Sequence, residues 1–312
     1  MAQFQCGRKW KDRFGRERAH GCLFKRDEPW EEACPECGGW YVCVPVGRIG
    51  DASASLAALV AKTSEAKRLA TGIAEVDRVL NGGLVRGSSL YITGEAGAGK
   101  TTLLMSVANY VAEKTERHVI YASGEQSDGA IGLVAKRVSA TSERVIPMGG
   151  VENVNQILDV AEDQKAILVV VDSVQTAFVE DCEAKVGSTE QVKAVANFVT
   201  SYATQKDVVI VLIGHRTADG RDAGPENMRH LVDVLTRIDK AGLGDLPPID
   251  EKDHDGVDPE EELKMLKGLR VFSCSKNRFG PEDVEAFLEM AEDGSGLRTP
   301  SKRRSKYLKL VT

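Results

Sequence analysis

The chain of 312 residues carries 47 acidic and 41 basic side chains, and its net charge of −6 does not by itself indicate a nucleic-acid-binding protein. It has no run of about 18 apolar residues, which argues against a membrane-spanning helix. Its polar, basic beginning does not resemble a secretory signal. We therefore expect a cytoplasmic protein without membrane contact, whose seven cysteines are thiols or metal ligands rather than disulfides.

Composition and charge divide the chain into four predicted regions. The first holds five of the seven cysteines, and its pair Cys34 and Cys37 has the C-x-x-C spacing of a metal-binding turn. Such a turn needs two further ligands to complete a tetrahedral zinc site. The predicted regions are a cysteine-rich module at 1–45, a linker at 46–70, a large domain at 71–297 and a basic tail at 298–312.

The large domain alternates between strand and helix patterns. The continuous apolar run at 166–173 is typical of a parallel strand buried on both faces, and residues 188–205 have the apolar spacing of an amphipathic helix. This alternation predicts an α/β fold with a mostly parallel central sheet. Further strands are expected at 88–95, 118–125 and 207–215, a helix at 100–115, and late antiparallel strands at 269–280 and 284–290.

The stretch that follows the strand at 88–95 fits the phosphate-binding pattern G-x-x-x-x-G-K-[ST] without a mismatch. Its glycines let backbone N–H groups curl around phosphates, Lys100 reaches the terminal phosphates and the Thr101 hydroxyl binds Mg²⁺. A strand before it and a helix after it are the context that this motif requires. The predicted nucleotide-binding residues are Gly94, Glu95, Ala96, Gly97, Ala98, Gly99, Lys100, Thr101 and Thr102.

Polar residues at the ends of the next strands are candidate partners of this loop. Asp172 ends an apolar strand and is the candidate for the metal-side acid. Glu125 ends the strand at 118–125 and could polarise a water molecule beside the γ-phosphate. Ser173, Gln175 and His215 are expected at the same edge, where open α/β sheets bind ligands; His215 could equally be a satisfied strand-end histidine.

Several stretches together resemble the bacterial RadA (Sms) family of RecA-related recombination ATPases. They are "TGIAEVDRVLNGGLVRGSSLYITGEAGAGKTTLL", "YASGEQS", "ILVVVDSVQT", "IGHRTADGRDAGPENMRHLVD" and "KNRFG", in this order. The pentapeptide "KNRFG" at 276–280 is the most specific of them. The resemblance covers about residues 70–297, with a weaker match at the N-terminus. It implies a RecA-like P-loop ATPase core at 71–297.

The resemblance also implies an activity and partners. It suggests a DNA-dependent ATPase that forms a homo-oligomeric ring, a hexamer by family pattern. Such a ring would use ATP and Mg²⁺ to move along single-stranded DNA and promote branch migration, together with a recombinase or a single-strand-binding protein. By position, Lys100 and Glu125 would be catalytic, and Asp172 would hold the magnesium with Thr101. Lys276 and Arg278 would also be catalytic, either at the nucleotide of a neighbouring subunit or by coupling it to DNA.

The sequence departs from the family pattern in three places, and the first two favour an alternative, an ATP-dependent switch or adaptor that assembles and recruits partners without translocating. The family's Lon-protease-like domain is expected to be missing after "GLRTPSKRR". The sequence "GHRTA" stands where the family has "GHVTK", although Arg216, Arg221 and Arg229 are possible DNA contacts. An acidic stretch at 245–262 is expected to be a solvated loop. The intact phosphate loop and its acidic partners favour the enzyme.

The same resemblance suggests a zinc finger at the N-terminus. The sequence "CPECGGW" is similar to the second half of the family's finger, and "FQCG" to its opening. A module of this size cannot fold around its own core without the metal, so Zn²⁺ joins ATP and Mg²⁺ as an expected cofactor. The favoured ligands are Cys6, Cys22, Cys34 and Cys37; a set that uses His20 or Cys43, or a turn that binds no metal, are the alternatives.

Overall fold

The structure is a computed structural model that describes residues 68–215, 228–242 and 266–301 in full, together with the backbone of five short strands nearer the N-terminus. The chain divides into two compact units, Met1–Glu65 and Ala66–Thr312, and each is described by itself. Most of the predicted linker and most of the basic tail lie outside the described residues, although β6 falls within the last residues of the predicted linker.

The N-terminal unit contains an antiparallel three-stranded sheet in the order β4-β1-β5 and a separate hairpin of β2 and β3. Cys6 and Cys43 are backbone partners where β1 pairs with β5. The other candidate zinc ligands, Cys22, Cys34, Cys37 and His20, lie outside the described residues, so the zinc finger stays a prediction. The strands are β1 (Ala2–Cys6), β2 (Lys9–Lys11), β3 (Glu17–Ala19), β4 (Leu23–Arg26) and β5 (Cys43–Pro45).

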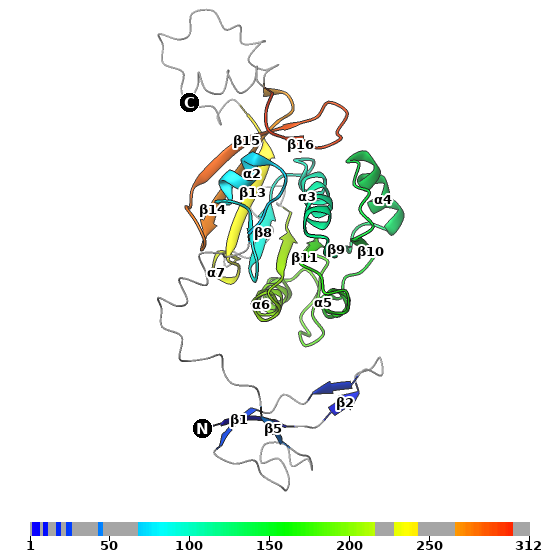
Figure 1. Cartoon of the computed structure of the whole chain (residues 1–312), viewed down its shortest axis with the longest axis vertical. Coiled ribbons are helices and arrows are strands. Elements are labelled where there is room, and N and C mark those ends of the chain that lie inside the picture. Colours follow the sequence, from blue (N-terminus) through cyan, green and yellow to red (C-terminus); the bar gives the residue numbers. More distant parts are fainter. Residues whose placement is uncertain are drawn as a thin grey trace, which may run out of the picture. The chain divides into compact units, whose positions relative to one another are not determined.

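The second unit is built on a nine-stranded sheet in the order β10-β9-β11-β12-β8-β13-β14-β15-β16 (Figure 1). The strands from β10 to β13 are parallel, and β14, β15 and β16 continue the sheet antiparallel. The predicted mostly parallel sheet is therefore confirmed. The strands are β8 (Ser89–Thr93), β9 (Val119–Ser123), β10 (Val145–Gly149), β11 (Leu168–Asp172), β12 (Val209–Ile213), β13 (Val234–Lys240), β14 (Leu269–Asn277), β15 (Val284–Met290) and β16 (Leu297–Arg298).

Helices flank this sheet, and a separate two-stranded antiparallel sheet of β6 and β7 precedes its first strand in the chain. Among the described segments, no helix is long and apolar enough to cross a bilayer. The helices are α2 (Ala74–Val79), α3 (Lys100–Thr115), α4 (Asp128–Arg137), α5 (Val154–Asp163), α6 (Thr189–Lys206) and α7 (Met228–Leu231); the strands of the small sheet are β6 (Arg68–Leu69) and β7 (Leu84–Val85).

The core lies on both faces of the sheet. In β12, Val209, Val211 and Ile213 belong to one apolar cluster, and Ile210 and Leu212 belong to the other. The first cluster includes residues of α2 and α3, and the second includes residues of α5 and α6. Because successive strand side chains point to opposite faces, a strand covered on both sides needs an unbroken apolar run. Polar residues are therefore left to the strand ends.

Candidate nucleotide-binding site

The glycine-rich segment 94–99 links the end of β8 to the start of α3. Gly94 has to be a glycine, because a Cβ there would lie 1.9 Å from the carbonyl oxygen of Ile238 in β13. Gly99 caps α3 with a φ of 106°, in the left-handed region that favours glycine. The tight turn leaves the first N–H groups of α3 without helical partners, which makes this end of the helix an anion site.

Lys100 opens α3 and is 6% exposed. Its ammonium donates hydrogen bonds to the carbonyl oxygens of Gly94, at 2.7 Å, and Glu95, at 3.0 Å. Burial lowers the pKa of Lys100, an effect that the negative charge of Asp172 opposes. A buried ammonium that is bound to neutral carbonyl groups gains from exchanging them for charged phosphate oxygens. The geometry therefore suits Lys100 for phosphate binding.

Three residues of the strands β13 and β14 hold the phosphate loop in place. The backbone N–H of Glu95 donates to Asp239 Oδ1 at 3.0 Å, and the Glu95 carboxylate accepts from the backbone N–H of Lys240 at 2.7 Å. Arg270 Nε donates to the carbonyl oxygen of Ala98 at 2.9 Å. These contacts fix the backbone on which a bound phosphate would rest. Reasoning from the sequence did not find Asp239 or Arg270.

Asp172 faces the first turn of α3 from the end of β11. Its Oδ2 lies 3.3 Å from Thr101 Oγ1 and 3.4 Å from the hydroxyl of Tyr121, which both donate to it. Asp172 is 4% exposed, and burial, followed by the negative charge of Glu125, raises its pKa. A hydroxyl and a carboxylate that converge in this way form an oxygen donor set suited to Mg²⁺. The residues present therefore fit the expected magnesium ion.

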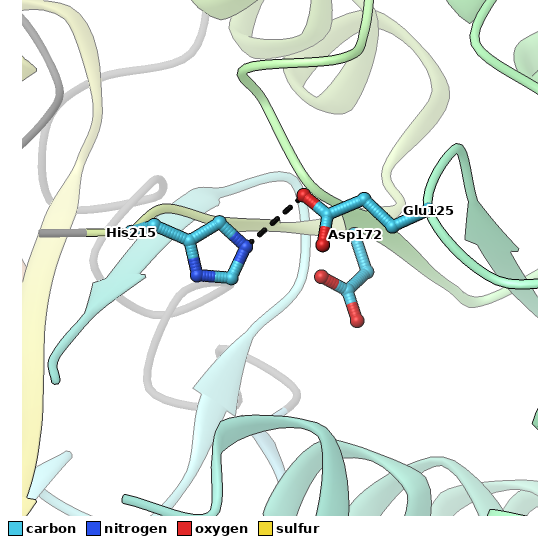
Figure 2. A group of neighbouring side chains, drawn as sticks. All are labelled: Glu125, Asp172 and His215. Carbon is cyan, nitrogen blue, oxygen red and sulfur yellow. Dashed lines mark ion pairs between the residues drawn. The ribbon is translucent and has the colours of Figure 1, made fainter. Parts of the chain in front are cut away.

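Glu125 and His215 join Asp172 at this edge of the sheet (Figure 2). One ligand atom of each residue lies within 4.8 Å of those of the other two. Ser173 Oγ donates to Glu125 Oε1 at 2.6 Å, and His215 Nε2 lies 3.2 Å from the same oxygen. The three residues lie at or just after the carboxyl ends of the neighbouring strands β9, β11 and β12, which a parallel sheet brings to one edge.

A cleft of about 560 Å³ opens beside the phosphate loop, a size typical of small-ligand sites. Arg137, on α4, borders it and donates to Thr102 Oγ1 at 3.0 Å. Met290, at the end of β15, packs beside Gly99, where a Cβ would meet its Cε at 2.8 Å. No sequence pattern marked Arg137 or Met290 as site residues. The lining residues are Ala96, Gly97, Gly99, Lys100, Thr101, Thr102, Gln126, Val134, Arg137, His215, Met290 and Gly294.

Lys276 and Arg278 do not join this group within one chain. The sheet register pairs Lys276 with Leu235 near the start of β13, whereas the phosphate loop lies at the other end of β13. The Lys276 ammonium donates to the carbonyl oxygens of Arg229 and, at 2.6 Å, Val232. Arg278 Nη1 lies 2.9 Å from Asp233 Oδ1. Both cations and the phosphate loop of their own chain therefore lie at opposite ends of the strands.

The predicted DNA contacts are only partly described. Arg216 and Arg221 lie outside the described residues. Arg229 is exposed, but its guanidinium is bound within the chain, to the carbonyl oxygen of Ser275 at 2.8 Å and to Glu282 at 3.0 Å. Nothing in the described part of the chain brings Arg229 to the nucleotide edge. DNA bound by Arg229 would therefore lie on the surface near Ser275 and Glu282, away from the phosphate loop.

Comparisons with known proteins agree with this architecture. A family model described as an AAA domain matches residues 85–221, which include the phosphate loop, Glu125, Asp172 and His215. The chain is 34% identical over 285 residues to the DNA repair protein RadA of Mycobacterium tuberculosis, covering 87% of this chain and 54% of that protein. It is 33% identical to the RadA of Haemophilus influenzae, covering 88% of this chain and 57% of that protein. The chain thus spans about half the length of these curated relatives.

Solved structures share the fold. A KaiC-like protein from Pyrococcus horikoshii superimposes with a TM-score of 0.56 at 15% identity, covering 76% of this chain and all of that protein. The RadB recombinase superimposes with a TM-score of 0.51 at 19% identity, covering 75% of this chain and all of that protein. At these identities the likeness shows a common RecA-like P-loop fold.

Proposed function

We propose that this chain, a homologue of the bacterial RadA proteins, is a DNA-dependent ATPase that acts in recombination and repair. The observation that carries the proposal is the convergence of three chemical groups at one edge of the sheet. Thr101 Oγ1 lies 3.3 Å from Asp172 Oδ2, and Glu125 joins Asp172 within 4.8 Å. A phosphate loop, a buried strand-end acid and a second carboxylate are the parts that ATP hydrolysis requires.

The proposed first step is binding of ATP in the cleft beside the phosphate loop. The backbone N–H groups of the loop and of the first turn of α3 would surround the phosphates. Lys100 would leave the carbonyl oxygens of Gly94 and Glu95 and bind the terminal phosphates instead. Thr101 and Asp172 would hold Mg²⁺, which neutralises phosphate charge and orients the reacting oxygens when it is bound.

The proposed base for hydrolysis is Glu125. A water oxygen would attack the γ-phosphorus while the bond to the bridging oxygen breaks, and the water proton would pass to the carboxylate. Ser173 donates to Glu125 Oε1 at 2.6 Å, and His215 Nε2 lies 3.2 Å from the same oxygen. These two contacts favour one orientation of the carboxylate, with Oε2 left to receive the proton.

Lys276 and Arg278 would complete the site from a neighbouring subunit. Their place at the end of the sheet opposite the phosphate loop supports a contact in trans rather than within the chain. The Arg278 side chain is 54% exposed and is thus accessible to a second subunit. Cations supplied in this way stabilise the charge that develops on the γ-phosphate and make hydrolysis depend on assembly. A homo-oligomeric ring, by family pattern a hexamer, is the proposed assembly.

The finer proposal is an ATP-driven motor on single-stranded DNA that promotes branch migration, working with a recombinase or a single-strand-binding protein. Arg216, Arg221 and Arg229 are the proposed DNA contacts, and Cys6, Cys22, Cys34 and Cys37 the proposed zinc ligands. Phosphate contacts of this kind would give salt-sensitive binding with little base specificity. Elemental analysis should find close to one zinc per chain, and metal-free protein would contradict the zinc finger.

One observation favours a second candidate function, the ATP-dependent switch or adaptor that assembles without translocating. The Lys276 ammonium is bound to the carbonyl oxygens of Arg229 and Val232 in its own chain. If these bonds persist in the assembly, Lys276 cannot reach a neighbouring nucleotide, and hydrolysis would be slow. In that case bound ATP would act mainly by stabilising the assembly.

The experiment that separates the two functions is ATP turnover with and without single-stranded DNA, at low and at moderate salt. The motor predicts stimulation by DNA that weakens as salt rises, because counterion release drives the binding. The matched control is Lys100→Ala, which should show no turnover in any condition. Slow turnover that DNA does not change would support the switch, and turnover that survives in Lys100→Ala would contradict both functions.

A further inference from the structure

The loop of the pentapeptide "KNRFG" is held by residues that lie far from it in the sequence. Arg68, in β6, donates from Nη2 to the carbonyl oxygen of Phe279 at 2.7 Å, and Asn81 donates to the same oxygen at 3.3 Å. We propose that Arg68 is a positioning residue that fixes this loop, and so sets how Lys276 and Arg278 are presented to a neighbouring subunit. The inference rests on the proposed role of these two cations in hydrolysis.

The turn after α2 is the platform on which the loop rests. Arg68 Nη1 donates to the carbonyl oxygens of Leu80, at 3.1 Å, and Gly83, at 3.4 Å, so one guanidinium bonds both the turn and the loop. The two segments also pack closely, because a Cβ at Gly280 would lie 2.7 Å from Cβ of Asn81. The helix that leads into this turn, α2, lies against β14 and β15 (Figure 1).

The loop has a second support at the residue before Phe279. The backbone N–H of Arg278 donates to the carbonyl oxygen of Asp233 at 3.2 Å, and its Nη1 donates to Asp233 Oδ1 at 2.9 Å. Asp233 is itself fixed, since its Oδ2 accepts from the backbone N–H of Ser89 at 3.0 Å. Arg68 and Asp233 therefore hold two neighbouring residues of the loop, Phe279 and Arg278. Loss of Arg68 would leave the Phe279 carbonyl to Asn81 alone among the described donors.

This placement predicts a specific kinetic signature. Arg68 lies with the loop at the end of the sheet opposite the phosphate loop, so nucleotide binding by the same subunit should not depend on it. The rate of hydrolysis would depend on it, because a displacement of about 1 Å in a catalytic group can cost a large factor in rate. A guanidinium donates in a planar fork that an ammonium cannot reproduce, so lysine should not replace Arg68.

The test compares Arg68→Ala with Arg86→Ala in the full chain. Arg86 follows β7, the partner strand of β6, but it pairs with Asp207 at the end of α6 and so provides a matched control. We expect Arg68→Ala to lower kcat about tenfold or more, with the Kd for a fluorescent ATP analogue unchanged within about twofold. Arg68→Lys should show the same loss, and Arg86→Ala should leave both quantities unchanged.

A double variant shows whether Arg68 acts through the loop. In an Arg278→Ala background, Arg68→Ala should cause little further loss, because residues that act as a unit are not additive. Independent, additive losses would overturn the inference, as would normal kcat in Arg68→Ala while Arg278→Ala is defective. Normal kcat in Arg278→Ala itself would instead contradict the proposed role of the cations, and with it the premise of the inference.

A milder variant covers the case in which Arg68→Ala does not fold. Asn81→Gly removes the second donor to Phe279 and suits the backbone, since Asn81 has a φ of 57°. We expect a loss in kcat of about twofold to fivefold, no change in nucleotide affinity, and no further loss in the Arg278→Ala background. Unchanged kcat in Asn81→Gly would then count against the loop support that we propose.

Discussion

Each end of the central sheet carries a basic side chain, but the groups that bind it differ. At the nucleotide end, Lys100 lines a cleft of about 560 Å³ and is bound only to neutral carbonyl groups among its described hydrogen bonds. At the other end, Arg278 is paired with Asp233 at 2.9 Å, and Asp233 is fixed by Ser89. The nucleotide end is thus arranged to gain a ligand, whereas the "KNRFG" end is already ordered by its own chain.

The electrostatics of the two ends follow the same division. At the nucleotide end, burial and the nearby Glu125 raise the pKa of Asp172, because two negative charges share one partly desolvated site. Mg²⁺ and ATP would relieve that repulsion. At the other end, burial and the charge of Arg278 lower the pKa of Lys276, but Asp233 opposes the shift. Charge is therefore already largely balanced at the "KNRFG" end.

The largest expected effect comes from removing the cation of the nucleotide end. Lys100→Ala should lower ATP turnover by about a thousandfold or more and abolish detectable ATP binding, because the loop loses its only side-chain cation within the motif. Turnover and equilibrium binding of a fluorescent ATP analogue are the measurements. Lys206→Ala, which removes a surface ion pair with Glu162, is the control and should bind and hydrolyse ATP normally. Normal turnover in Lys100→Ala would show that ATP is not hydrolysed at this edge of the sheet.

The next effect separates binding from chemistry at the same end. Glu125→Gln should still bind ATP with Mg²⁺ but lower kcat by about a hundredfold to ten-thousandfold, because the amide cannot accept the proton of the attacking water. Single-turnover hydrolysis, measured beside Kd, distinguishes the two steps. A variant with wild-type kcat would show that Glu125 is not the base.

A smaller effect is expected from the residue that orients Glu125. Ser173→Ala removes the hydroxyl that donates to Glu125 Oε1 at 2.6 Å, and kcat should fall about fivefold to tenfold with Kd for ATP unchanged. The loss should vanish in a Glu125→Gln background, where there is no base to orient. A Ser173→Ala loss of equal size in both backgrounds would point to a general structural defect instead.

The smallest expected effect is a change in thermal stability when the charge of Asp172 is removed. Asp172 has a raised pKa in the fold, so the fold loses stability as pH rises through that value and the carboxyl group ionises. Asp172→Asn should therefore raise Tm by a few degrees at neutral pH without ligand, yet lose the extra Tm that Mg²⁺ and ATP add to the wild type. Thermal melts with and without ligand measure both. An unliganded Tm below that of the wild type would contradict this reading of Asp172.

The candidate site was predictable where its chemistry is local. The phosphate loop is one continuous motif, and Asp172 and Glu125 end apolar runs whose carboxyl ends a parallel sheet gathers at one edge. Asp239 and Arg270 were not predictable, because they reach the loop through contacts 144 and 172 residues apart in the chain. Arg137 is likewise brought to the cleft by packing of α4 and has no motif of its own.

The fold was predictable to a similar degree. Buried strands such as β11 and β12 read as continuous apolar runs because both faces are covered. Strand β10 was missed, since it is an edge strand that contains Pro147 and is only half-buried. The hydrogen bonds of Lys276 were also not predictable from the sequence, because only the sheet register brings its ammonium to the carbonyl oxygens of Arg229 and Val232.

The most direct test of the relation between the two ends is a mixing experiment with Lys100→Ala and Arg278→Ala subunits. Lys100→Ala alone should be inactive for lack of ATP binding, and Arg278→Ala alone should keep only a small residual turnover for lack of the cation in trans. In random mixed assemblies about a quarter of the interfaces would join an intact phosphate loop to an intact "KNRFG" loop, and turnover should recover to about that share of the wild type. If tagged co-purification shows mixed assemblies but turnover stays at the level of the separate variants, the two ends do not form one site.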